Sequence, residues 1–261
     1  MKSIFRFQTK DELYAHLKSA AYEEPIVSYV DRKEDVVYQN VTFKDPEVGR
    51  IVANTWGDGK TPVSLSDIVK VTSIDGTFYK NTAITSFDEF ENFISVTVLD
   101  YQSIRGCFNG CKNLTSIKFP ESLRTISSYC FNSVGLSALT FNEGLVKLDP
   151  YAINSYSKLV YIELPTTITT IERNNFRPDG INLPTRVVFR GTTPPAFDSV
   201  DCFRYYANGA WRNNNAAKIY VPYSPDHSVL ETYQNNSGFA DVISRGIKVY
   251  ELDEDGNIPQ G

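Results

Sequence analysis

Ser224 and His227 are the residues whose types and spacing come closest to catalytic chemistry. They lie three positions apart, a separation at which a hydroxyl nucleophile and an imidazole base could share one helical turn. Ser224 also precedes Pro225, and a serine followed by proline is typical of the cap and first position of a helix. No G-x-S-x-G, H-E-x-x-H, P-loop or G-x-G-x-x-G motif occurs in the sequence. We therefore predict that the protein is not an enzyme.

The rival hypothesis is an enzyme whose site lies in residues 197–223 or in the N-terminal part of the chain. Asp201 or His227 would then take part in turnover. Only two histidines, His16 and His227, occur among the 261 residues. This excludes multi-histidine metal sites and leaves few ways to build a histidine-based triad.

Four cysteines and one acidic segment are the candidates for metal or redox chemistry. Cys107 and Cys111 lack the second pair, or the suitably placed histidine, that would complete a four-ligand zinc site. Residues 253–257 (DEDGN) cluster carboxylates but lack the full loop and terminal glutamate of a calcium-binding hand. We predict no metal site and no cofactor, and we interpret residues 253–261 as a polar, frayed tail.

Charge and hydropathy exclude two classes of partner. The chain has 26 basic and 31 acidic residues, a formal net charge of −5, and no block of lysine and arginine. Phosphate binding relies on clustered cations, so we predict no nucleic-acid partner. No apolar run approaches the roughly 18 residues of a membrane-spanning helix, so we predict no membrane insertion.

An internal repeat is the strongest signal in the sequence. Apolar residues recur in columns with a period of 22 or 23 residues, as in the repeat families that form solenoids. An upstream copy keeps the same internal spacing, with about eight extra residues within 91–103, which gives five turns in total. The columns are Phe108, Phe131, Ile153 and Phe176; Leu114, Leu136 and Leu159; Ile117, Leu139 and Ile162; and Ile104, Ile126, Leu148 and Ile171; the upstream copy contributes Ile74, Phe78, Ile84 and Phe87.

The alternation in each unit predicts a short strand. In LTSIKFP, we expect Leu114, Ile117 and Phe119 to lie in the core, and proline at 120 or 165 ends the strand because it donates no ladder hydrogen bond. We predict a leucine-rich repeat solenoid, a right-handed coil of short β-strands. The repeat places Cys107 and Cys130 in one column, about 5 Å apart, so they are either buried free thiols or a disulfide.

The stretch IRGCFNGCKNLTSIKFP, at 104–120, resembles the unit of the BspA-like leucine-rich repeats, which reads I-x-x-x-A-F-x-x-C-x-x-L-x-x-I-x-I-P. The resemblance covers residues 71–191, and 191–197 and 218–239 are similar to the family's closing segment. Residues 57–93 are similar to leaders of such proteins from gut Bacteroidetes and their phages. Those leaders often carry a calcium-loop-like element, of which only Gly57-Asp58-Gly59 and Ser64 remain here.

The chain divides into four parts. Residues 1–46 form an α+β head, with a T-x-x-E capping box at Thr9 and Glu12 and strands at 25–30 and 35–43; the head is either an N-terminal cap or an attachment module. Residues 47–70 form a connector and residues 71–191 the leucine-rich repeats. Residues 192–261 form an α+β closing segment, with a helix running from Pro225 through Tyr233 and a strand at 246–252.

Two sets of residues are candidates for partner binding. One points outward from the repeat strands, and the other lies in an aromatic-rich loop at 201–215 that is too long for a simple turn. The alternatives are that the strand face is simply solvated, and that the loop's rings seal the C-terminal end of the core. The candidates are Thr115, Lys118, Thr140, Tyr161 and Glu163 on the strands, and Tyr205, Tyr206 and Trp211 in the loop.

These observations predict a non-enzymatic binding or structural protein. The family resemblance implies adhesion to a protein or glycan on a host surface. The N-terminus, MKSIFRFQTKDEL, has no apolar secretory segment. We therefore expect a virion-associated decoration, fibre or tail protein that contacts the host surface or neighbouring virion subunits. The alternative is a bacterial cell-surface or extracellular adhesin whose leader was removed.

Overall fold

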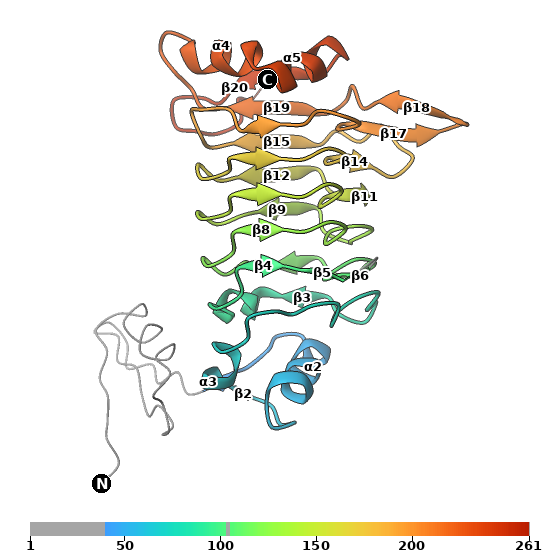
Figure 1. Ribbon diagram of the computed structural model, residues 1–261, viewed down its shortest axis with the longest axis vertical. Helices are drawn as coiled ribbons and strands as arrows, with labels where there is room; N and C mark the ends of the chain where they lie inside the picture. Colours follow the sequence, from blue (N-terminus) through green and yellow to red (C-terminus); the bar gives the residue numbers. More distant parts are fainter. Residues whose placement is uncertain (1–39, 103–104, 261) are drawn as a thin grey trace.

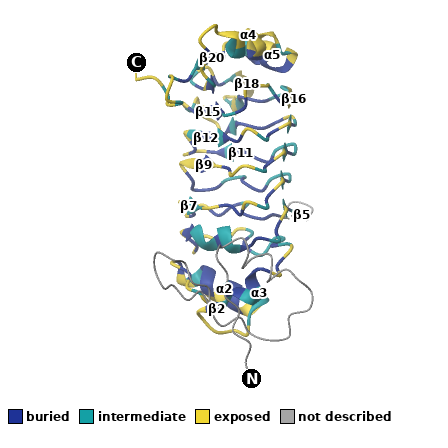
Figure 2. Cartoon of the chain, turned by 90° about the vertical axis from the view of Figure 1, so that its left-hand side faces the viewer, coloured by how far each residue is buried: buried dark blue, intermediate teal, exposed yellow. Residues whose placement is uncertain are grey.

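The computed structural model describes residues 40–102 and 105–260, with helices at both ends of a long stack of β-strand coils (Figure 1). Buried residues run through the interior of the whole stack (Figure 2). The helix and strands expected before residue 40, and Ile104, lie outside the described residues. None of the helices in these two ranges has the length and hydropathy to cross a bilayer.

One side of the stack is a parallel five-stranded sheet in the order β16-β13-β10-β8-β4. The predicted column of Ile126, Leu148 and Ile171 is confirmed, because these residues are direct partners in the ladder. Ile104, the predicted first member of the column, lies outside the described residues, and the residue that pairs with Ile126 on this side is Leu99. The strands are β4 Val98–Leu99, β8 Thr125–Ile126, β10 Lys147–Leu148, β13 Thr170–Ile171 and β16 Ala196–Phe197.

The physical reason is a local insertion. β5 (Tyr101–Gln102) and β6 (Arg105–Gly106) form a small antiparallel pair between Leu99 and the next coil. A 3₁₀ helix, η1 (Asp88–Asn92), adds further residues before β4. The extra residues therefore fall on both sides of β4. For this reason, counting back from Phe108 by the internal spacing of the repeat does not lead to the first member of the ladder column.

The other side is a second parallel sheet, in the order β20-β19-β15-β12-β9. Leu139 pairs with Ile162 as predicted, and the column continues through Val187, Ile219 and Val249. The ladder thus runs past residue 191 into the predicted closing segment. The strands are β9 Ala138–Thr140, β12 Tyr161–Leu164, β15 Arg186–Phe189, β19 Lys218–Val221 and β20 Lys248–Glu251; upstream, β3 Ser86–Phe87 pairs with β7 Ser116–Ile117.

Phenylalanine rings stack along the interior. The ring centroids of Phe78 and Phe108 are 5.8 Å apart and those of Phe108 and Phe131 are 5.7 Å apart. Leu114 and Phe119 are buried as predicted, whereas Ile117 is only half-buried. β12 ends directly before Pro165 as predicted, but β7 already ends at Ile117, before Pro120. All four cysteines are free and buried, which confirms the thiol interpretation over the disulfide.

Two short helices and a strand pair close the N-terminal end. They are α2 (Pro46–Trp56), α3 (Leu65–Ile68) and the antiparallel strands β1 (Asn40–Val41) and β2 (Val63–Ser64). Asp45 caps α2 by accepting hydrogen bonds from the backbone N–H groups of residues 47 and 48. Its second carboxylate oxygen accepts from the Thr85 hydroxyl at 2.8 Å, which ties the helix to the first coil.

Helices α4 (Ser228–Asn235) and α5 (Ser237–Ser244) close the C-terminal end (Figure 1). The Phe239 ring centroid lies 4.9 Å from that of Phe197 and 5.3 Å from that of Phe189. The prediction that the helix starts at Pro225 is wrong, because His227 has a φ of 59° and its N–H donates to the Ser224 carbonyl in a turn. Ser224 Oγ still accepts a hydrogen bond from the Val229 N–H, at 3.1 Å.

The interpretation of residues 253–261 as frayed is also wrong for the described residues up to 260. Leu252 is buried with Val188 and Tyr220 in a small apolar cluster on the outer face of the second sheet, and Ile258 packs against this cluster. The Gly256 carbonyl accepts a hydrogen bond from Arg190 Nη1 at 2.6 Å. The tail is mostly polar, and its composition does not show that its one apolar side chain packs the tail against the sheet.

Candidate functional site

A β-hairpin projects from the side of the stack near its C-terminal end (Figure 1). It consists of β17 (Arg204–Ala207) paired antiparallel with β18 (Ala210–Asn213). Asn208 and Gly209 form the two-residue turn with φ of 52° and 75°, as expected for a type I′ turn. The sequence interpretation of 201–215 as a long aromatic-rich loop is therefore wrong for residues 204–213, and the Asn-Gly pair is the signal that could have corrected it.

Strand alternation divides the hairpin's side chains between two faces. Tyr206 and Trp211 are direct cross-strand partners on one face, with ring centroids 5.2 Å apart in an edge-to-face arrangement. Tyr206 is 54% exposed and Trp211 43%. Tyr205 pairs with Arg212 on the opposite face. The structure therefore brings together two of the three predicted rings and separates the third from them.

Arg177 joins this ring pair to the solenoid. It lies on β14 (Arg177–Pro178), which pairs with β11 (Asn154–Tyr156). The guanidinium carbon is 4.2 Å from the Trp211 ring centroid and 5.8 Å from that of Tyr151. Burial lowers the pKa of the Arg177 guanidinium, which stays charged at any physiological pH. We call Tyr151, Arg177, Arg204, Tyr206 and Trp211 the hairpin face.

Sequence reasoning missed Arg177 and Arg204. Neither follows the apolar period, and Arg177 comes to Trp211 only because the coil places β14 beside the hairpin. The Arg204 guanidinium carbon lies 5.9 Å from the Trp211 ring centroid. A cation over an indole face adds about 0.5–1 kcal/mol at an exposed site, so these contacts orient the tryptophan without burying it.

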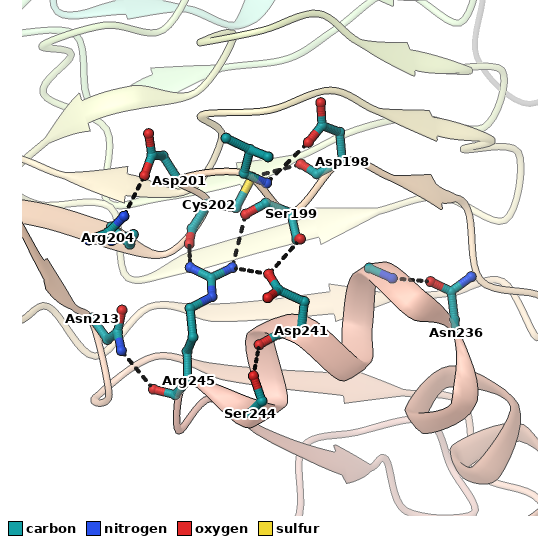
Figure 3. Close-up of polar contacts among 12 residues, drawn as sticks. Asp198, Ser199, Asp201, Cys202, Arg204, Asn213, Asn236, Asp241, Ser244 and Arg245 are labelled. Carbon is teal, nitrogen blue, oxygen red and sulfur yellow. Dashed lines mark hydrogen bonds and ion pairs between the residues drawn. The ribbon is translucent and has the colours of Figure 1, made fainter.

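The base of the hairpin is fixed by Arg245, at the end of α5 (Figure 3). Its guanidinium donates to the Cys202 carbonyl at 3.0 Å and to the Ser199 carbonyl at 2.9 Å. It also pairs with Asp241 at 2.9 Å, and hydrogen bonds from Ser199 and Arg245 lower the pKa of that carboxyl. Arg204 is held separately by Asp201, at 2.6 Å. The hairpin is thus presented from a braced base.

The predicted strand residues are a separate group. Thr115, Lys118 and Thr140 are exposed, but Tyr161 and Glu163 are half-buried. Glu163 pairs with Arg190 at 2.7 Å and accepts a hydrogen bond from the Tyr161 hydroxyl. Burial alone would raise the pKa of Glu163, but these two contacts outweigh the effect of burial and lower the pKa. Tyr161 and Glu163 therefore interact with each other and with the chain's own Arg190.

Ser224 and His227 meet at a carboxylate that sequence reasoning missed. His227 Nδ1 lies 2.5 Å from one oxygen of Glu251, and Ser224 Oγ lies 3.4 Å from the other. The hydroxyl also accepts the Val229 N–H, so it serves as a cap. Serine and imidazole thus contact one shared carboxylate, an arrangement that differs from a nucleophile bound to its general base.

The pKa values of three of the four thiols, those of Cys107, Cys111 and Cys202, are raised. Burial raises the pKa of Cys111 and of Cys202 to about 12. A hydrogen bond with Cys130, together with burial, raises the pKa of Cys107 well above its ordinary value. Thiolates are the reactive form, so these side chains are core residues. Among the residues in the described ranges, no three His, Cys, Asp or Glu side chains gather in a group able to hold a metal ion.

Comparison with protein families gives one match. Residues 72–183 match the family described as BspA type leucine-rich repeat region, in six copies, where column spacing predicts five turns. Neither the curated proteins nor the solved structures gave a match.

Proposed function

We propose that this protein, whose residues 72–183 are BspA-type leucine-rich repeats, is a non-enzymatic binding protein that contacts its partner through the hairpin face. Repeats of this type serve as scaffolds for binding. The solenoid supplies a rigid column, and the braced hairpin presents two aromatic rings beyond it. Rigid aromatic rings give large contact area at little entropic cost, so they are frequent binding anchors.

One observation carries the proposal: of the seven large apolar side chains that are exposed in the described residues, four belong to the hairpin or to segments next to it, and the other three, Val146, Val160 and Tyr223, lie elsewhere. Tyr206 and Trp211 are on the hairpin, Val200 lies just before it, and Ile181 follows Gly180, which packs beside the Tyr206 carbonyl. Ile181 is 42% exposed and Val200 is 53% exposed. Apolar side chains that gather on a surface, with charged groups beside them, are typical of interaction sites.

The partner that fits is a protein or a glycan on a host surface. The rings supply apolar stacking area for such a partner. We place the protein in a virion, as a decoration, fibre or tail component; a bacterial cell-surface adhesin is the alternative. Mass spectrometry of purified virions should detect it. A gene located among polysaccharide-utilisation genes behind a leader would contradict the virion assignment.

Changing Trp211 to alanine tests the proposal. The probe is an array of purified glycans and cell-surface proteins, read with labelled full-length protein. Trp211→Ala should weaken binding to the best array ligand by about 30-fold or more, the loss expected for an interface anchor of about 2 kcal/mol. The melting temperature should stay nearly unchanged, because the ring is not part of the core.

Tyr223→Ala is the matched control. Tyr223 is a 36% exposed ring outside the hairpin face, and its removal should leave binding intact. A large fall in melting temperature for Trp211→Ala would instead make this ring part of the core's C-terminal seal. If the Trp211→Ala and Tyr223→Ala variants bound the ligand with equal affinity, the hairpin face would not be the binding site.

The enzyme hypothesis has its own test. Turnover of any hydrolase substrate by the purified protein, abolished by Asp201→Asn or His227→Gln, would overturn the binding assignment. We expect no such turnover, since Asp201 is paired with Arg204 and the His227 imidazole contacts Glu251.

A further inference from the structure

Three cations form a row on the outer face of the second sheet. Arg186, Lys218 and Lys248 are the first residues of β15, β19 and β20, and backbone pairing places each directly beside the next. All three are exposed. Neighbouring strands lie about 4.8 Å apart, so the row spans about 10 Å. Tyr161, the partner of Arg186 on β12, continues it by one strand.

Strand alternation fixes the outward direction of this row. The residues that follow the three cations, Val187, Ile219 and Val249, belong to the main core. The cations therefore point to the opposite face of the sheet, where Tyr220 and Tyr250 occupy the neighbouring column. The two tyrosine rings are stacked, with centroids 5.6 Å apart.

The three cations of the row have no ion-pair partner in the part of the chain that the structure describes. Glu163, on the same sheet face, is paired with Arg190. Lys218 Nζ lies 5.4 Å from the Tyr250 ring centroid. Like charges side by side on adjacent strands destabilise a sheet, and an external anion would relieve this repulsion.

We propose that this row, flanked by Tyr161 and Tyr250, binds a linear acidic polysaccharide through its carboxylate or sulfate groups. The site is independent of the hairpin face. Three cations in register match a polymer that carries acidic groups at regular intervals. Duplex DNA carries a charge about every 1.7 Å, which is much closer than the roughly 4.8 Å between neighbouring cations of the row.

The test measures binding of the full-length protein to immobilised polygalacturonate and heparin, with uncharged dextran as reference. The triple variant Arg186→Gln, Lys218→Gln, Lys248→Gln should bind at least tenfold more weakly than the original protein. Binding of the original protein should weaken steeply between 50 and 200 mM salt, because ions screen exposed charges. The melting temperature of the triple variant should be unchanged or higher, since repulsion is removed.

The matched control removes three exposed lysines elsewhere, by Lys60→Gln, Lys70→Gln and Lys112→Gln. It has the same net charge as the test variant and should bind like the original protein. Equal weakening in both triple variants would show that only overall charge matters and would overturn the site. No preference for the acidic polymers over dextran would do the same.

Two other polyanions serve as competitors. Single-stranded DNA or poly-L-glutamate that binds as tightly as polygalacturonate would contradict the assignment to a polysaccharide. Trp211→Ala, included in parallel, should leave this binding intact. An experiment that rejects the polysaccharide site at the cation row can therefore be distinguished from one that rejects binding at the hairpin face.

Discussion

Leu139 and Thr140 are neighbours on β9 with opposite environments. Leu139 is 1% exposed and pairs with Ile162 on the next strand, whereas Thr140 is exposed. The sequence predicts this difference, because a column that repeats every 22 or 23 residues can be buried only if each member faces the same interior. It could not predict Leu99, since an insertion of irregular length separates it from its column.

We expect Leu139→Ala to reduce the free energy of unfolding by about 2–5 kcal/mol, through lost burial and the cavity left between coils. Thr140→Ala should change it by less than about 0.5 kcal/mol. Denaturant unfolding of the two variants measures both values. Equal losses would contradict the assignment of Leu139 to the core and of Thr140 to the surface.

At the scale of elements, the strands that follow the repeat period were predictable, whereas the inserted strands and the connections were not. The hairpin contains an Asn-Gly turn between aromatic runs, a local signal that is independent of the repeat period. Its bracing by Arg245 was beyond prediction, because the arginine lies 32 residues after Asn213, whose side-chain amide donates to the Arg245 carbonyl at 3.1 Å. The repeat period predicts the strands of each coil, but it carries no information about contacts made by residues outside the coils, such as those of the hairpin.

Asp45 makes the N-terminal cap sensitive to acid. Burial by itself raises the pKa of Asp45, but hydrogen bonds from Thr85, Val48 and Ser86 outweigh it and lower the pKa. The ionised carboxylate therefore stabilises the fold at neutral pH. This contribution is lost as the pH falls below the ordinary aspartate value of 3.8 and through the lower folded value.

Asp45→Asn should reduce the free energy of unfolding at pH 7 by about 1–3 kcal/mol, because the amide cannot accept every bond that the carboxylate accepts. The difference from the original protein should shrink as the pH falls below about 4. Unfolding curves from pH 7 to pH 3 test this. A difference that stays constant over that range would show that the charge of Asp45 does not matter.

At the scale of the molecule, stacking assembles surfaces from distant residues. Arg186, Lys218 and Lys248 are separated by about 30 residues each, so the sequence shows no basic block although the fold forms a basic row. The C-terminal tail is a similar case. Its one apolar residue, Ile258, packs on the outer face only because β12, β15 and β19 create an apolar cluster there.

Removing residues 253–261 should therefore destabilise the protein. It exposes the cluster around Val188 and Tyr220 and deprives Arg190 of its bond to the Gly256 carbonyl. We expect a loss of about 1–3 kcal/mol in the free energy of unfolding. Ile258→Ala should reproduce part of it, while Asn257→Ala, at an exposed tail position, should cost less. No change on truncation would mean that the tail is frayed in solution.

Hydrogen–deuterium exchange of the protein with its best array ligand tests most directly the claim that the hairpin face binds the partner. We predict slower exchange in residues 204–213 and in the adjoining segment around Arg177, with little change in α4 and α5. Protection confined to α4 and α5, or to the strands that carry Thr115 and Thr140, with none at the hairpin, would contradict the account.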